Sequence, residues 1–251
     1  MGNSPNHIKF SLKATGQLQS PALTWLSNEP RLVSQWPLQG EKLRQVNLLV
    51  DEQLEKGHLV PTDSPWNFSI FTIQKSSGKW RLLQDLRELN KIIEPMGALQ
   101  PGLPTMIPSE WPIIIIDIKD CFFNIALHPK DSRRFAFTVP SINAAEPSQH
   151  YHWTILPQGM RNSPSVCQRV IAEVLPSIRW QFPQTILYHY IDDILLAAES
   201  KEQLAQLHRT VKATLSRHGL EVAPEKEQMT MPWKYLGYHI NNTTTGGPLV
   251  V

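Results

Sequence analysis

The tetrapeptide Tyr190-Ile191-Asp192-Asp193 constrains the fold more than any other part of the sequence. It lies between two apolar runs, at 185–188 and 194–197. Two such runs around a short polar turn predict a β-hairpin. Two adjacent carboxylates beside apolar strands are costly to bury unless a cation neutralises them, and their oxygen ligands suit Mg²⁺. An ordinary Asp-containing turn explains the tetrapeptide equally well.

A second acidic position lies far upstream, where Asp117 follows Ile113-Ile114-Ile115-Ile116. Four consecutive β-branched residues predict a strand that is buried on both faces. Asp117 could simply cap the segment that follows. Alternatively, a carboxylate at a strand end and a carboxylate pair on a neighbouring hairpin could hold two metal ions, roughly 3.5–4 Å apart, for phosphoryl transfer. Spacing alone does not establish that these residues meet.

Five sequence blocks occur in a fixed order. They are KWRLLQDLRELN at 79–90, IIIIDIKDCFF at 113–123, LPQGMRNSP at 156–164, YIDD at 190–193 and WKYLGY at 233–238. Together they resemble the catalytic blocks of retroviral reverse transcriptases, and their residues are most similar to those of betaretroviruses and the endogenous type-K elements. The resemblance covers residues 23–240. It implies an α+β fold of the right-hand polymerase type, with fingers and palm subdomains and an antiparallel palm sheet backed by helices.

The resemblance also implies roles for individual residues. Asp117, Asp192 and Asp193 would be the catalytic carboxylates and, with the backbone of Ile118, would hold two Mg²⁺ ions, for which Mn²⁺ could substitute. The nucleotide would be bound by Lys75, Arg81, Asp120, Cys121, Phe122 and Gln158. Primer or template would contact Tyr190, Arg161, Leu236 and Gly237. Phe122 would exclude a 2′-hydroxyl by its bulk, although a Phe is usually a core residue. Lys226 could approach the triphosphate.

The implied activity is RNA-directed and DNA-directed DNA synthesis from dNTPs on a primed RNA or DNA template. Residues 1–22 would form a flexible arm, 23–112 mainly fingers, 113–240 mainly palm with a fingers portion at 125–155, and 241–251 a tail. A thumb and a ribonuclease H domain would be absent, so low processivity is expected. Two alternatives are an inactive endogenous remnant that binds nucleic acid, and a module that associates with an intact polymerase, as a homodimer or with other Pol subunits.

Local patterns predict the remaining elements. An amphipathic helix is expected at 41–56, a hairpin around Ser76-Ser77-Gly78, and paired strands at 135–139 and 150–155. Asp85 and Glu88 have capping-box spacing and predict a helix at 85–93. Ser163-Pro164 should open one helix, and Ser200 with Gln203 should cap another that ends at Gly219. The Pro-rich segment 94–112 should contain no regular element.

Composition adds few exclusions. The 251 residues carry a net charge of +2, but the window from Lys75 to Lys91 holds five basic and two acidic residues and could face phosphate. No apolar stretch approaches the roughly 18 residues of a membrane helix, and the N-terminus has no apolar signal core. Cys121 and Cys167 are too few for a disulfide framework. An intracellular setting, in the cytoplasm or a virus-like particle, is therefore expected.

Overall fold

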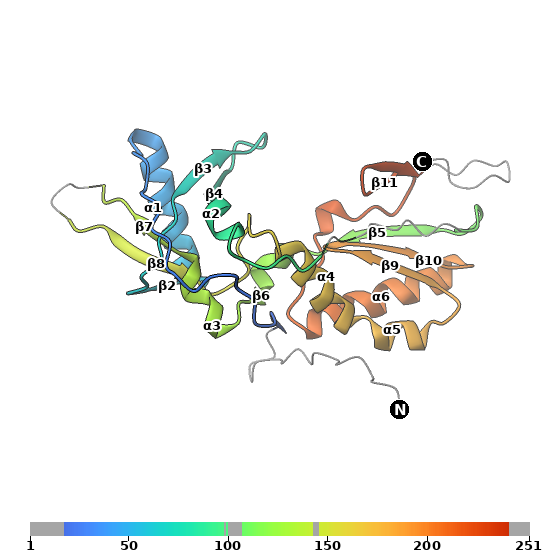
Figure 1. Ribbon diagram of the computed structural model, residues 1–251. Helices are drawn as coiled ribbons and strands as arrows, with labels where there is room; N and C mark the ends of the chain where they lie inside the picture. Colours follow the sequence, from blue (N-terminus) through green and yellow to red (C-terminus); the bar gives the residue numbers. More distant parts are fainter. Residues whose placement is uncertain (1–17, 98, 100–106, 143–145, 241–251) are drawn as a thin grey trace, which may run out of the picture. The chain divides into compact units, whose positions relative to one another are not determined.

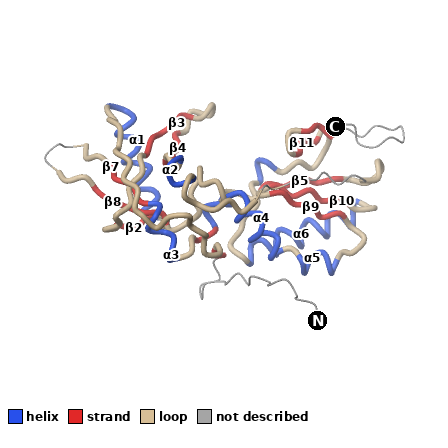
Figure 2. The backbone as a smooth tube through the Cα atoms, viewed as in Figure 1, coloured by secondary structure: helices blue, strands red, loops and turns tan. Residues whose placement is uncertain are grey.

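The computed structural model describes residues 18–97, 99, 107–142 and 146–240. The chain divides into two compact units (Figures 1 and 2). The first comprises Gln19–Met96 and Phe122–Ser163, and the second comprises Gly97–Cys121 and the described chain from Pro164 onward. The predicted arm and tail fall largely outside the described residues, as does part of the Pro-rich segment. The assignment of residue ranges to fingers and palm stays a prediction.

The first unit contains one long helix and several short antiparallel sheets. Helix α1 (Gly40–Glu55) buries Val46 and Val50, and the chain leaves it through Gly57, which has a φ of 69°. Only glycine adopts such a φ without strain, which explains why the helix ends there. The predicted helix at 41–56 is therefore confirmed with a shift of one residue.

Two antiparallel sheets in this unit contain the predicted strand pairs. One is the hairpin of β3 (Ile70–Gln74) and β4 (Trp80–Gln84), and the other has the order β2-β8-β7. The second sheet consists of β2 (Leu59–Pro61), β8 (Gln149–Trp153) and β7 (Ala136–Val139). Shorter elements are β1 (Leu18–Gln19), β6 (Ile125–Ala126), α2 (Arg87–Asn90), α3 (Pro129–Ser132), and the 3₁₀ turns η1 (Cys121–Asn124) and η2 (Arg133–Phe135).

The predicted helix at 85–93 is much shorter than expected. Helix α2 contains only four residues, and its N-cap position is Leu86, which makes no side-chain cap. The Asp85 carboxylate accepts a hydrogen bond from the Arg87 N–H at 3.1 Å, two residues ahead. A capping box also needs the Glu88 carboxylate to accept from the Asp85 N–H, but that N–H donates to the Ser69 carbonyl at 2.8 Å and Glu88 accepts from Lys91 instead. The capping-box prediction was wrong for this reason.

The second unit is built on a three-stranded antiparallel sheet with the order β5-β10-β9. Its strands are β5 (Ile113–Asp117), β9 (Ile186–Tyr190) and β10 (Asp193–Ala197). Ile113, Ile115, Leu195 and Ala197 pack against Trp233, Tyr235 and Ile240 of the hairpin β11 (Trp233–Tyr235) and β12 (Tyr238–Ile240). Helix α6 (Lys201–Arg217) contacts β5 and β10. The isoleucine strand is thus buried as predicted.

The helices of this unit begin where the sequence predicts. Helix α4 (Ser163–Val174) starts at Ser163-Pro164, and α5 (Pro176–Gln181) follows it. The Ser200 hydroxyl accepts a hydrogen bond from the Gln203 N–H at 3.2 Å and caps α6. Figure 1 shows α5 and α6 together below β9 and β10, while β11 lies above β5. No helix among the described residues is long and apolar enough to cross a membrane.

Candidate active site

The YIDD hairpin turns over two residues, Ile191 and Asp192, because Tyr190 pairs directly with Asp193. Ile191 has a φ of 58°, which is strained for a β-branched residue. Helix α4 holds this conformation. The Gln168 Oε1 atom accepts a hydrogen bond from the Ile191 N–H at 2.6 Å, and the Cys167 Sγ donates to the Ile191 carbonyl at 3.7 Å. The turn is therefore fixed from below by two neighbouring helical residues.

The sheet register brings the distant carboxylates together. Asp193 pairs with Asp117 at the end of the β10–β5 ladder. The Ile118 N–H then donates to the Asp192 carbonyl at 2.7 Å. All three aspartates are only partly accessible to solvent. The predicted meeting of Asp117 with Asp192 and Asp193 is thus present in one sheet end of the second unit.

This crowding changes the acidity of the hairpin carboxyls. Burial, followed by the charges of Asp192 and Asp117, raises the pKa of Asp193 to about 6 from an ordinary value of 3.8. Burial, with a smaller effect from Asp117, also raises the pKa of Asp192. Both shifts mean that the folded chain disfavours the ionised form of these groups. A cation bound among them would relieve that cost.

One cation from the chain already contacts this cluster. The Lys226 Nζ donates to both Asp117 carboxylate oxygens at 2.9 Å. Burial lowers the pKa of Lys226, but the hydrogen bonds and charge of Asp117, together with Asp192 and Asp193, outweigh it, so the pKa is raised overall. Lys226 is the last residue of the turn η3 (Pro224–Lys226).

The cluster offers the oxygen donors that Mg²⁺ and Mn²⁺ prefer. Among the described residues, however, no three His, Cys, Asp or Glu side chains converge into a ligand set for a metal ion. The two Asp117 oxygens accept from the Lys226 ammonium, which stands where a cation is expected. The carboxylates suit a divalent ion in ligand type and charge, but in the described part of the chain their side chains do not converge on one point. The expected contribution of the Ile118 backbone stays a prediction.

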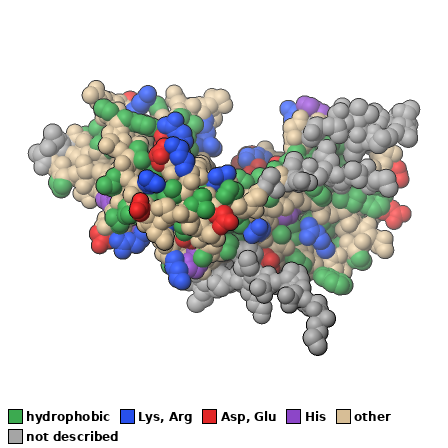
Figure 3. Space-filling model, viewed as in Figure 1, with side chains coloured by type: hydrophobic (Ala, Val, Ile, Leu, Met, Phe, Trp, Pro, Cys, Tyr) green, Lys and Arg blue, Asp and Glu red, His purple; other side chains and the backbone are tan. Residues whose placement is uncertain are grey.

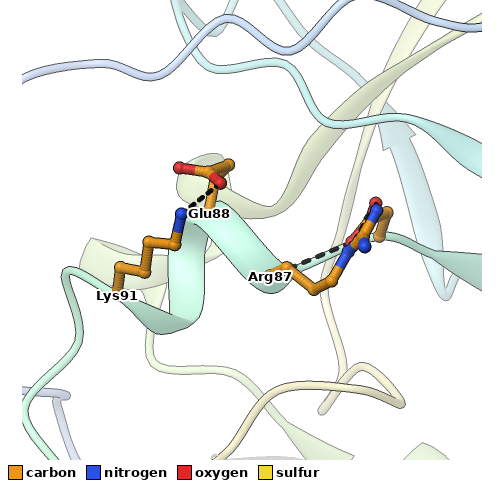
Figure 4. Close-up of polar contacts among 4 residues, drawn as sticks. Arg87, Glu88 and Lys91 are labelled. Atoms are coloured by element: carbon orange, nitrogen blue, oxygen red, sulfur yellow. Dashed lines mark hydrogen bonds and ion pairs between the residues drawn. The ribbon is translucent and has the colours of Figure 1, made fainter.

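The predicted phosphate-binding residues Lys75 and Arg81 lie in the first unit, at the β3–β4 hairpin. Lys75 is exposed and Arg81 is half-buried. Two other basic residues of the same window are neutralised locally, since Arg87 pairs with Asp85 at 2.6 Å and Lys91 pairs with Glu88 at 2.6 Å (Figure 4). Lys and Arg side chains gather on the surface over β4 and α2 (Figure 3).

The loop that contains Gln158 is organised by Asn90. The Asn90 Nδ2 donates to the Gly159 carbonyl at 2.8 Å, and its Oδ1 accepts from the Arg161 N–H at 2.9 Å. Gly159 has a φ of 93°, which strains any other residue. Gln158 itself is half-buried and Arg161 is exposed. The side chain of Asn162 is buried. It donates to the Glu94 carbonyl and accepts from the Met96 N–H, which ties the end of this loop to the segment after α2.

Comparison of the sequence with known proteins identifies its family. A sequence profile of the reverse transcriptase (RNA-dependent DNA polymerase) family matches residues 73–240. The chain belongs to the reverse transcriptase family. It is 51% identical over 221 residues to the Gag-Pro-Pol polyprotein of Mason-Pfizer monkey virus, with 87% of this chain and 12% of that protein covered. The polyprotein of sheep pulmonary adenomatosis virus is 52% identical, with 87% and 13% covered.

A third relative is the Gag-Pro-Pol polyprotein of Simian retrovirus SRV-1. It is 47% identical over 251 residues, with 94% of this chain and 14% of that protein covered. The predicted resemblance to betaretroviral Pol is therefore confirmed. The reverse transcriptase chain spans only 12–14% of the length of these three relatives.

The remaining predicted site residues of this reverse transcriptase have well-defined surroundings. Asp120 is exposed with a φ of 47°, and Cys121 is buried with a free thiol. Phe122 is half-buried. Its neighbour Phe123 is also half-buried and stacks on Trp153 in the first unit, with ring centroids 6.3 Å apart.

The primer-contact predictions fall on two turns of the second unit. Leu236 and Gly237 form the two-residue turn between β11 and β12, with φ values of 50° and 83°. Such a turn requires positive φ at both positions, which suits Gly237 and strains Leu236. Tyr190 is half-buried at the end of β9. The contacts that these three residues would make with a primer stay predictions.

Sequence reasoning missed two polar residues that organise the loops. Gln168 supports the YIDD turn, and Asn90 supports the Gln158 loop. Gln168 is separated from Ile191 by 23 residues, and Asn90 from Gly159 by 69. No short-range pattern relates residues so far apart, although Asn90 ends the block at 79–90 and Gln168 follows the block at 156–164. Lys226 was assigned to a triphosphate rather than to Asp117.

Proposed function

We propose that this chain is the polymerase region of an RNA-directed and DNA-directed DNA polymerase. It would add dNTPs to the 3′-hydroxyl of a primer on an RNA or DNA template. The observation that carries the proposal is the register that pairs Asp193 with Asp117 at one sheet end. Family membership supports the same reaction class.

Asp117, Asp192 and Asp193, with the backbone of Ile118, would hold two Mg²⁺ ions, or Mn²⁺ in their place. When bound, such ions lower the pKa of the attacking hydroxyl and neutralise the departing pyrophosphate. The raised pKa values of Asp192 and Asp193 support this role, because a site with excess buried negative charge gains most from a cation.

The other residues would position substrates. Lys75 and Arg81 would contact the nucleotide phosphates, and the backbone at Asp120 and Cys121 would lie under them. Gln158 would contact the nucleotide, and Phe122 would exclude ribonucleotides by steric bulk. Tyr190, Arg161, Leu236 and Gly237 would hold primer and template. Base pairing would select the nucleotide, so the protein would need to recognise only duplex shape and backbone.

The template-primer and dNTPs are the proposed partners. Association with a second copy or with other Pol subunits is part of the same proposal. Arg87 and Lys91 already pair with carboxylates. The basic residues left to contact phosphate are those of the β3–β4 hairpin, Lys75, Lys79 and Arg81, for which no ion pair is found among the described residues.

Primer extension tests the proposal directly. The substrates are an RNA template with a DNA primer, dNTPs and Mg²⁺ at low salt. Asp117→Asn, Asp192→Asn and Asp193→Asn should each lower the extension rate at least about 100-fold, as expected when electrostatic stabilisation is lost. Asp51→Asn, at an exposed position of α1, is the matched control. Template binding is measured in parallel by fluorescence anisotropy.

The outcomes separate the alternatives. Extension by the wild type and the control alone supports the polymerase. Extension by all variants would refute the role of the carboxylates. Binding of template-primer without extension by any protein would favour the non-catalytic remnant or the partner module.

A further inference from the structure

The Lys226 ammonium contacts Asp117 in the way that a bound cation would. One ammonium engages both carboxylate oxygens at 2.9 Å. The Asp117 side chain is 15% exposed, whereas that of Lys226 is 57% exposed. The carboxylate is thus fixed in the sheet, and the lysine reaches it from solvent on a flexible stem.

The main chain on both sides of Lys226 is tied to β5. The Ala223 N–H donates to the Asp117 carbonyl at 2.9 Å. Gln228 exchanges two backbone hydrogen bonds with Ile115, at 2.8 and 3.1 Å. These bonds bracket Lys226 and fix its Cα close to Asp117, so the ion pair follows from the fold rather than from a chance side-chain conformation.

Glu227, the residue after Lys226, is anchored to helix α6 and not to β5. Glu227 lies against α6, where its carboxylate is 2.5 Å from the Lys212 Nζ and 3.2 Å from the His208 Nε2. The Glu227 side chain is only 12% exposed. It therefore holds the end of η3 against the helix, while Lys226 points to the aspartates. Only the lysine side chain itself remains free to move.

We propose that Lys226 is an internal counter-ion that competes with a divalent cation for Asp117. Without metal, its ammonium offsets part of the repulsion among three carboxylates. For a divalent ion to bind Asp117, the ammonium must leave, because two cations on one carboxylate repel each other. This inference rests on the proposed function, since it takes Asp117 to be a metal ligand.

Metal binding measured without nucleic acid or nucleotide tests the inference. Mn²⁺ is titrated into the wild type, Lys226→Gln and Lys226→Arg, and free Mn²⁺ is followed by electron paramagnetic resonance. Lys226→Gln should bind Mn²⁺ about three- to tenfold more tightly, the range expected for removing a partly exposed competing charge. Lys226→Arg, which keeps the charge, should stay close to the wild type.

Lys201→Gln is the matched control. It removes the same charge from the same unit, but it lies at the start of α6, just beyond the opposite end of β10 from Asp193. It should leave Mn²⁺ affinity unchanged. Adding Asp117→Asn to Lys226→Gln should abolish the gain. Thermal melting confirms that each variant is folded.

The outcomes distinguish a failure of the Lys226 inference from a failure of the proposed metal role of Asp117. If Asp117→Asn weakens Mn²⁺ binding but Lys226→Gln does not strengthen it, the competition is refuted and the proposed metal role of Asp117 stands. An equal gain in Lys201→Gln would reduce the effect to net charge and would also overturn the inference. If no protein binds Mn²⁺ through Asp117, the metal proposal fails and the inference fails with it.

Discussion

Replacing Asp193 by Asn should stabilise the metal-free protein at neutral and alkaline pH. The folded chain raises the pKa of Asp193 to about 6 from 3.8, mainly through burial and then through Asp192 and Asp117. An acid with a raised folded pKa loses stability as pH rises from its unfolded pKa through its folded one. At about 1.4 kcal/mol per pKa unit, the shift sets an upper limit of about 3 kcal/mol on the cost of ionised Asp193 at pH 8, and solvent screening at this partly exposed side chain reduces that cost.

The Asn variant removes the charge and keeps the shape. Among the described residues, no hydrogen bond to the Asp193 carboxylate is found, and the shift of its pKa arises from burial and charge, so the amide loses no acceptor interaction there. We expect the free energy of unfolding to increase by about 1–3 kcal/mol at pH 8, and by about half as much at pH 5, where the wild type is largely protonated.

Urea unfolding in EDTA at pH 5 and pH 8 measures both quantities. Asp51→Asn, an exposed substitution on α1, should change the unfolding free energy by less than about 0.5 kcal/mol at either pH. A destabilised Asp193→Asn, or a gain that does not grow between pH 5 and pH 8, would refute the reasoning. Added Mg²⁺ should reverse the order by stabilising the wild type more than the variant.

Three further predictions concern the supporting residues. Gln168→Ala leaves the Ile191 N–H without its acceptor at a strained turn, and urea unfolding should show a loss of about 1–3 kcal/mol. Asn90→Ala removes two hydrogen bonds to the Gln158 loop, so limited proteolysis should cut near Gly159 faster than in the wild type. Burial, with a smaller effect of Arg179, lowers the pKa of His189 to about 4. The stability that neutral His189 contributes is therefore lost as pH falls from 6.5 towards 4. In the Asp193→Asn background, the free energy of unfolding should fall by up to about 3 kcal/mol over this range, and His189→Gln should remove this pH dependence.

Much of the second unit could be predicted because its signals are local. The YIDD hairpin, the isoleucine strand and the Ser200 cap are each determined by residues within a short window, and all are present. The prediction of a capping box at Asp85 failed because the Asp85 N–H donates to the carbonyl of Ser69, a partner that the local spacing does not reveal. The pairing of Lys91 with Glu88 is also local, because residues three apart are neighbours on a helix.

The site itself depends on contacts that no local pattern encodes. Lys226 and Asp117 are 109 residues apart, and their pairing exists only because the chain returns along β5 between Val222 and Gln228. The ligand chemistry of the three aspartates could be inferred from residue type and family. The contact of Lys226 with Asp117 could not, because no local pattern relates two residues that are 109 positions apart.

The register of β10 against β5 decides whether the carboxylates meet at all. Alternating burial normally fixes register, because a slip of one residue turns every side chain to the other face. Here both faces of β5 are buried, so an Ile or Leu is tolerated at each position and the alternation carries little information. The register must instead be set at the end of the ladder, where the Ile118 N–H donates to the Asp192 carbonyl and Asp193 faces Asp117. The end of the ladder that places the three charges side by side must therefore withstand their repulsion, which the Lys226 ammonium on Asp117 offsets in part.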